Sequence, residues 1–127
     1  MQYMLLMCSD ETAEPRPEDD CRLPGVGRDA LAAWMRETEA RGVRLLTGAR
    51  LDLGAEARTV RDRRGELFVT DGPFAETKEQ VGGFEVIECA DLDEAVEVAS
   101  RHPSARTGKI EVRKVFNDEI GRSPGDP

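Results

Sequence analysis

The chain has 127 residues, of which 39% are hydrophobic, and this length allows one domain with its own core but not two. Its formal net charge of -8 would repel a phosphate backbone or an anionic membrane surface, which argues against nucleic-acid and membrane binding. The three cysteines form no CxxC pair and leave one unpaired in any disulfide scheme, and no segment is typical of a signal peptide, so we expect a cytoplasmic protein.

The first half of the chain predicts a strand, a helix and a second strand. Residues 3–8 are continuously apolar, which is typical of a buried strand. A proline-rich, acidic stretch follows and predicts a loop. Between residues 30 and 38, apolar side chains recur at helical spacing, and Gly42 stands where a left-handed helix cap belongs. Residues 43–51 then read as the second strand.

The middle of the chain predicts a β-hairpin followed by a third main strand. Residues 59–62 and 66–70 flank Arg63-Arg64-Gly65, a short connection whose glycine is free to take positive φ. Residues 77–80 are polar and predict a short helical turn or a lid. The third main strand covers residues 83–89.

A second helix and a last strand complete the domain. Asp91 followed by Glu94 matches the capping box of a helix start, and Pro103 after His102 marks the end of that helix. Residues 109–116 alternate apolar and charged side chains, as in a strand with one buried face. We therefore expect one domain over residues 1–116 and a polar, flexible tail over residues 117–127.

This order of elements predicts an α+β fold: a ferredoxin-like sandwich, β-α-β-β-α-β, with the hairpin inserted. Both helices would cover the same face of an antiparallel sheet. The other face would carry apolar residues from the first and third strands. A bare apolar face of that size predicts a homodimer.

In this topology several polar side chains should converge at one edge of the sheet, which is a natural place for a cleft. They come from the end of the first strand, the start of the first helix, the region after the hairpin and the end of the second helix. These candidate site residues are Ser9, Arg28, Asp71, Lys78 and His102.

Asp71 allows two interpretations. Its carboxylate can hold an Asx turn through backbone N–H groups two or three residues on, while Pro73 fixes φ and Gly72 supplies freedom. Alternatively, a carboxylate at a cleft mouth can act as a general base or orient an imidazole. The two roles are compatible, because a turn that fixes the carboxylate also preorganises it.

His102 is the only histidine, and therefore the only side chain whose ordinary pKa lies near neutrality. Next to Asp71 it would form a catalytic dyad. The alternative is a residue at a helix C-terminus that complements the helix dipole. Arg28, Lys78 and Ser9 are candidates for binding a ligand, and no residue spacing indicates a metal or another cofactor.

The run Val69-Thr70-Asp71-Gly72-Pro73-Phe74-Ala75-Glu76-Thr77-Lys78-Glu79-Gln80-Val81-Gly82-Gly83-Phe84 resembles the signature of the YCII-related family, in its DGPF branch. The resemblance extends from residues 3–7 to the last strand. It implies a dimeric α+β barrel. Some members carry a histidine at the start of the first helix in an acid-base dyad with an aspartate, and one relative is a dehydrochlorinase of a chlorinated hydroquinone. Residues 26–31 contain no histidine here.

Two functions follow from these observations. The first is a small-molecule enzyme that uses Asp71 and His102 for acid-base chemistry in the cleft. The alternative is a non-catalytic ligand-binding or regulatory dimer. Proteins of the DGPF type are often encoded beside extracytoplasmic-function sigma factors, so the resemblance implies a link of this kind for the second function.

Overall fold

The computed structural model describes residues 1–12, 26–73 and 79–116. Predictions for the acidic loop, for residues 74–78 and for the tail lie outside these ranges. The elements, in chain order, are β1 (Gln2–Asp10), α1 (Val26–Ala40), β2 (Arg44–Arg50), a 3-10 turn (Gly54–Glu56), β3 (Arg58–Arg63), β4 (Glu66–Asp71), β5 (Glu79–Glu88), α2 (Leu92–Ser100), α3 (Ser104–Thr107) and β6 (Lys109–Lys114).

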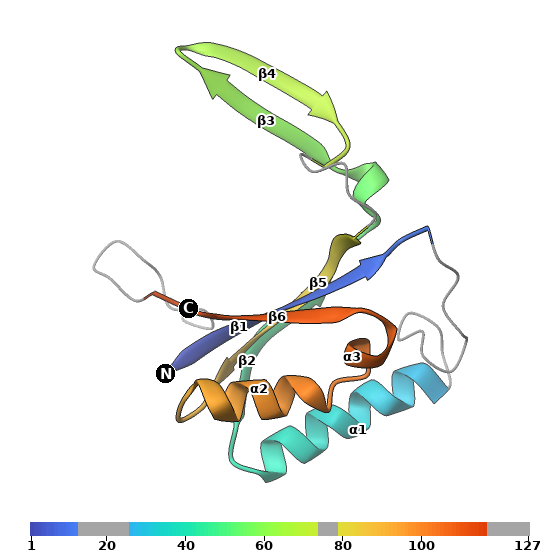
Figure 1. Cartoon of the computed structure of the whole chain (residues 1–127), viewed down its shortest axis with the longest axis vertical. Coiled ribbons are helices and arrows are strands. Elements are labelled where there is room, and N and C mark those ends of the chain that lie inside the picture. The colour runs from blue at the N-terminus through green and yellow to red at the C-terminus, as the bar shows by residue number, and fades with distance from the viewer. Residues whose placement is uncertain (13–25, 74–78, 117–127) are drawn as a thin grey trace.

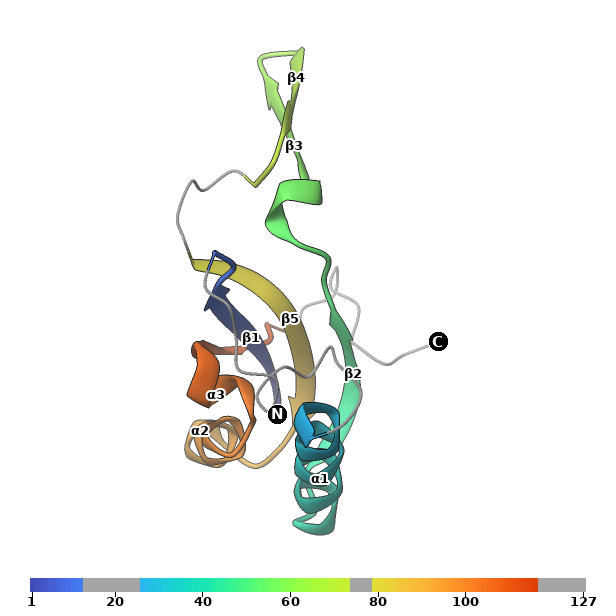
Figure 2. The same cartoon turned by 90° about the vertical axis from the view of Figure 1, so that its right-hand side faces the viewer.

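Four strands form the main sheet in the order β2-β5-β1-β6, and each neighbouring pair is antiparallel. The three helices lie on one side of this sheet, and the β3–β4 hairpin extends beyond its end (Figure 1, Figure 2). The fold is therefore α+β with antiparallel sheets, as predicted, and it is compatible with a ferredoxin-like arrangement.

The core lies between the sheet and the helices. Period-two alternation along β1 turns Tyr3, Leu5 and Met7 toward the helices, and each is buried. Trp34 of α1 and Val98 of α2 meet these strand residues, and the Trp34 indole N–H donates a hydrogen bond to the Val98 carbonyl at 2.9 Å. The only tryptophan thus joins the two longer helices within the core.

The opposite face of the sheet is also apolar. Met4 pairs with Val86 and Leu6 pairs with Phe84, and the side chains of cross-strand partners point to the same side. Their strand positions alternate with those of the core residues, so they point away from the helices. None of the described helices packs against this face (Figure 2).

The hairpin has the turn that the sequence predicts. Arg64 and Gly65 both take positive φ, 54° and 84°, as in the two-residue turns that match the twist of paired strands. The Asp62 carboxylate accepts the backbone N–H of Gly65 at 2.9 Å and holds the turn from one side. Prediction assigned positive φ to the glycine alone, whereas Arg64 shares it.

Two local predictions need correction. Glu79 and Gln80 belong to β5 instead of a helical turn, because they pair with Asp10 and Ser9 of β1. The backbone bonds of a neighbouring strand outweigh the weak local preference of this polar segment. The four-residue helix α3 after Pro103 was not predicted, since one turn of helix carries no periodic signal.

The start of α2 offers a measurable test of the capping box. Glu94 N donates to Asp91 Oδ1 at 2.9 Å, and Ala90 N donates to Glu94 Oε1 at 3.0 Å. We expect Asp91→Ala to lower the free energy of unfolding by about 1 kcal/mol and Asp91→Asn to retain most of it, as measured by urea denaturation. Asp93→Ala, which changes a nearby acidic residue that makes no capping bond, should cost only a few tenths of a kcal/mol. Equal losses at both positions would contradict the cap.

Candidate functional site

Polar side chains gather at the end of the sheet where β1 and β2 finish and β5 and β6 begin. Asp10, the last residue of β1, pairs with Glu79, the first of β5, and Glu79 Oε1 lies 3.5 Å from the Lys109 ammonium of β6. Ser9 lies in the same group, opposite Gln80. The ends of these strands therefore meet here, and of the predicted site residues Ser9 is the one that lies in this group among the described residues.

Carboxylates at this end hold the backbone of neighbouring loops. Glu11 Oε1 accepts the backbone N–H of Gly54 at 2.7 Å, which ties the 3-10 turn after β2 to the end of β1. Asp10 Oδ1 accepts the backbone N–H of Thr12 at 2.9 Å. The carboxylates of Asp10 and Glu11 therefore stabilise the backbone at this end of the sheet.

The predicted ligand-binding residues are not assembled into a site within the described residues. Arg28 is exposed in the first turn of α1. Ser9 is half-buried in the sheet, and Lys78 lies outside the described residues. Their roles in binding a ligand stay predictions.

Asp71 ends β4 at the base of the hairpin. Its carboxylate is 86% exposed and lies 3.0 Å from Arg58 Nε on the paired strand. Gly72 takes φ of 87°, and its backbone N–H donates to the Ala57 carbonyl at 2.7 Å. A backbone hydrogen bond therefore closes the base of the hairpin at Gly72, and the Asp71 carboxylate is largely exposed to solvent. The N–H group that the predicted Asx turn would use belongs to residue 74, which lies outside the described residues, so this turn stays a prediction.

His102 lies in the core between α2 and α3. It is 5% exposed, and its ring meets the Trp34 ring edge to face, with centroids 4.5 Å apart. Its Nδ1 accepts the backbone N–H of Ser104 at 3.0 Å, which supports the start of α3. Burial lowers the pKa of the imidazole to about 4, so the ring is neutral at physiological pH.

The structure does not bring Asp71 and His102 together. The end of β4 lies with the projecting hairpin, whereas the α2–α3 junction lies under the main sheet, and both views separate them (Figure 1, Figure 2). Each side chain also has a different partner, Arg58 for Asp71 and Trp34 with Ser104 for His102. The described residues therefore do not form the predicted dyad.

A different carboxyl group occupies an unusual position. Glu85 of β5 pairs with Leu5 on one side and with Gly48 of β2 on the other. Since cross-strand partners share a face and Leu5 is fully buried in the core, the Glu85 side chain also lies on the helix-covered side. Among the described residues, no hydrogen bond or ion pair engages its carboxylate.

Gly48 makes room for this carboxyl group. A Cβ atom at residue 48 would overlap the Glu85 carboxylate in its present position, so any other residue there would displace the carboxylate. Desolvation raises the pKa of Glu85 from 4.5 to about 7, and no nearby cation offsets it. At neutral pH the group is therefore present in both protonation states, as a general acid or base requires.

Prediction from the sequence missed Glu85, although its spacing carries a signal. Gly83, Glu85 and Ile87 occupy alternate positions of one strand, and Ile87 is fully buried. Period-two alternation therefore places a charged residue on the covered face. The prediction chose His102 instead, because it is the only histidine of the chain.

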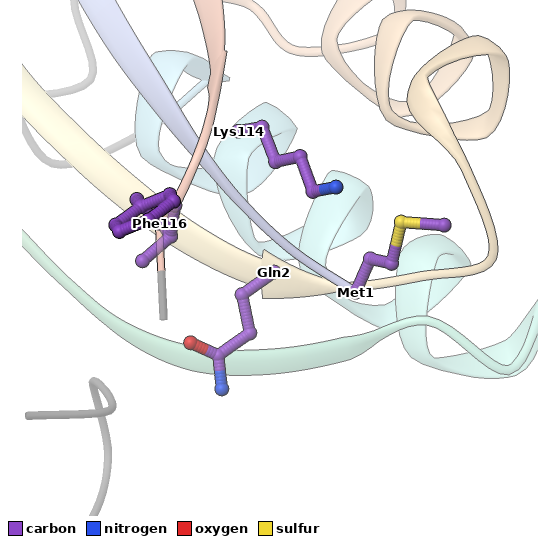
Figure 3. Close-up of a pocket in the computed structure, with 5 residues that line it drawn as sticks. Met1, Gln2, Lys114 and Phe116 are labelled. Carbon is purple, nitrogen blue, oxygen red and sulfur yellow. The ribbon is translucent and has the colours of Figure 1, made fainter. Parts of the chain in front are cut away.

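A hollow of about 310 Å³ lies at the opposite end of the sheet, where β1 begins and β6 ends. Met1 and Lys114 lie on one side of the strands there and Gln2 and Phe116 on the other (Figure 3). Among its described lining residues, the ionisable groups are Lys114 and the terminal amine, and the amine donates to the Cys89 carbonyl at 3.0 Å. Its described lining residues include no carboxylate, imidazole or thiol.

Other chemistries find little support in the described ranges. No group of three or more His, Cys, Asp or Glu side chains gathers there in a way that would hold a metal ion. Burial raises the pKa of both Cys8 and Cys89, which disfavours the thiolate, and Cys21 lies outside the described residues. The described helices include none that is long and apolar enough to cross a bilayer.

Comparison with known proteins gives a family and a relative. The model of a family described as the YCII-related domain matches residues 1–118. A protein of Rhizobium meliloti (strain 1021), described as uncharacterised, is 41% identical over 128 residues, which cover 98% of this chain and 99% of that protein.

Proposed function

The chain belongs to the YCII-related family, and from this premise we propose that it is a homodimeric small-molecule enzyme in which the Glu85 carboxyl group transfers a proton. The observation that carries this proposal is the position of Glu85. Its carboxyl group lies on the covered side of the sheet, in space left by Gly48, without a partner among the described residues. A structural carboxylate at such a position would be expected to have one.

The apolar face of the sheet supports the dimeric part of the proposal. Met4, Leu6 and Phe84 point away from the helices and are only partly buried in the single chain, whereas Val86 on the same face is already buried. Packing this face against the same face of a second copy would cover the rest of it and form the α+β barrel. Glu85 points to the other side of the sheet, so the dimer contact and the reaction would use different surfaces.

The chemistry suits a weakly acidic C–H or O–H group. The ionised carboxyl group takes a proton from a carbon next to a carbonyl, or from a phenol, and becomes the neutral acid. The neutral acid then returns the proton to another atom of the same molecule. The substrate class is therefore an enolisable or phenolic small molecule, and His102 and Asp71 have structural roles in this proposal.

Solvent exchange tests the proposal. Enolisable carbonyl compounds and chlorinated hydroquinones are incubated with the protein in deuterated water, and proton NMR follows the loss of the C–H signal. We expect the rate with the wild type to rise with pH around an apparent pKa near 7, and to fall at least about a hundredfold in Glu85→Gln.

Glu88→Gln is the matched control, because Glu88 is on the same strand but pairs with Arg44 at 3.5 Å. It should keep full activity. Unchanged activity in Glu85→Gln would rule out Glu85 as the base. A compound that binds but does not react with the wild type would favour the alternative, a ligand-binding or regulatory dimer that includes the sigma-factor link.

A further inference from the structure

We propose that the β3–β4 hairpin, residues 58–71, is an arm that packs against a second copy of this chain. The inference rests on the homodimer proposed above but not on the chemistry of Glu85. It assigns to the dimer a second contact, separate from the apolar face of the sheet.

The arm stands apart from the main sheet. Its two strands pair with each other and with no strand of the four-stranded sheet, and both views show it beyond the sheet's end (Figure 1, Figure 2). Its base is closed by bonds from Gly72 N to the Ala57 carbonyl at 2.7 Å and from Thr59 Oγ1 to the Gly72 carbonyl at 2.8 Å. These two hydrogen bonds fix the base of the arm next to residues 57 and 72.

One face of the arm is apolar and uncovered. Val60 pairs with Val69, and Leu67 lies on the same face; these side chains are 66%, 57% and 65% exposed. Phe68, on the other face, is 44% exposed. An isolated two-stranded hairpin is marginally stable in water, so this one needs a surface to pack against.

Charge favours a second copy as that surface. The arm carries four arginines and three acidic residues, whereas the remaining residues carry 14 basic and 23 acidic side chains. Arg61, Arg63 and Arg64 near the tip form no ion pair within the described residues. A weakly basic arm on a strongly acidic body fits an acidic protein surface, and another copy of the same chain provides one.

In a two-fold dimer the contact is reciprocal: each copy extends its arm onto the other. A single substitution then removes two contacts at once. The contact also adds to the area buried by the sheet faces, which matters because a stable interface needs about 800 Å² from each partner.

Val60→Asp in the full-length protein tests the arm by sedimentation equilibrium. We expect the wild type to have twice the 14.0 kDa chain mass at micromolar concentration, and the variant's dimer dissociation constant to rise at least about a hundredfold. Val96→Asp, which places the same charge on the exposed surface of α2, should leave the constant unchanged. The fluorescence of buried Trp34 reports whether each variant is folded.

Hydrogen exchange gives an independent measurement on the wild type. Amides of residues 58–71 should become more protected as the protein concentration passes through the dissociation constant. An unchanged constant in Val60→Asp, with the dimer intact, would overturn the arm while leaving the dimer and Glu85 untouched. The proposal that a second copy covers the arm would be wrong if the wild type stays monomeric and the amides of residues 58–71 become protected only when phosphatidylglycerol vesicles or duplex DNA are added.

Discussion

Replacing Glu85 by Gln is expected to raise the free energy of unfolding by roughly 2 kcal/mol at pH 8, less than the full pKa shift would give, because water screens the charge of this half-buried group. Burial raises the pKa of this carboxyl group in the folded state to about 7, above its ordinary value of 4.5. The stability it contributes is therefore fully present below pH 4.5 and is lost as pH rises through 7. At pH 8 the folded protein holds an unpaired, half-buried negative charge, and the neutral amide removes that cost.

Urea denaturation at pH 4.5 and pH 8, at one fixed protein concentration, measures this effect. The gain should vanish at pH 4.5, where the folded wild type is already protonated. Glu88→Gln, which removes a surface charge paired with Arg44, should change stability by no more than about 0.5 kcal/mol at either pH. A Glu85→Gln protein that is less stable than the wild type at pH 8 would show that the charge has a stabilising partner.

Together with the exchange assay, this result separates function from structure. A residue kept for stability loses stability when it is replaced. Glu85→Gln should instead gain stability while it loses activity, the trade-off that is typical of functional groups in strained or desolvated positions.

His102 should contribute the opposite dependence on pH, of similar size. The pKa of its imidazole is lowered by burial to about 4 in the folded state, from an ordinary value of 6.5. The stability it contributes is fully present above pH 6.5 and is lost as pH falls through 4, because the unfolded chain binds the proton more tightly. The loss amounts to about 3 kcal/mol.

Because Glu85 and His102 titrate in overlapping ranges with opposite signs, the His102 effect is best measured in the Glu85→Gln background. In that background, adding His102→Gln should abolish most of the loss of stability between pH 6.5 and pH 4 and also cost some stability at neutral pH through lost packing on Trp34. Two-dimensional carbon–proton NMR measures the pKa of His102 directly, because the protein has one histidine and therefore one set of imidazole C–H signals, whose chemical shifts change with protonation. A titration midpoint of these signals above pH 6 would contradict the buried position of His102.

Local patterns predicted most of the fold. The hairpin turn at Gly65, the cap at Asp91 and the helix end before Pro103 each depend on residues close in sequence, and all three are present. The continuously apolar residues of β1, together with the apolar residues of β5, likewise predicted an apolar sheet face opposite the helices. These features succeed because short-range chemistry decides them.

The candidate site was harder to predict, because it depends on long-range placement. The dyad of Asp71 and His102 required the hairpin to fold back over the sheet edge, whereas it projects away and Asp71 pairs with Arg58. No local pattern specifies that direction. Glu85 becomes notable only once the strand register sets it beside Leu5 and Gly48, and register is a property of three strands together.

The strand order β2-β5-β1-β6 leaves β2 and β6 as the edge strands of the main sheet, where further strands could add and form a cross-β fibre. These edge strands offer unpaired backbone groups to any passing chain. The edge strand β6 carries four charged side chains, Lys109, Glu111, Arg113 and Lys114. The other edge strand, β2, carries Arg44 and Arg50 and is interrupted by a bulge at Leu46. A chain adding at either edge would have to pack beside charged side chains or past the bulge, which disfavours pairing. Copies should therefore meet face to face, and concentrated solutions should resist cross-β assembly.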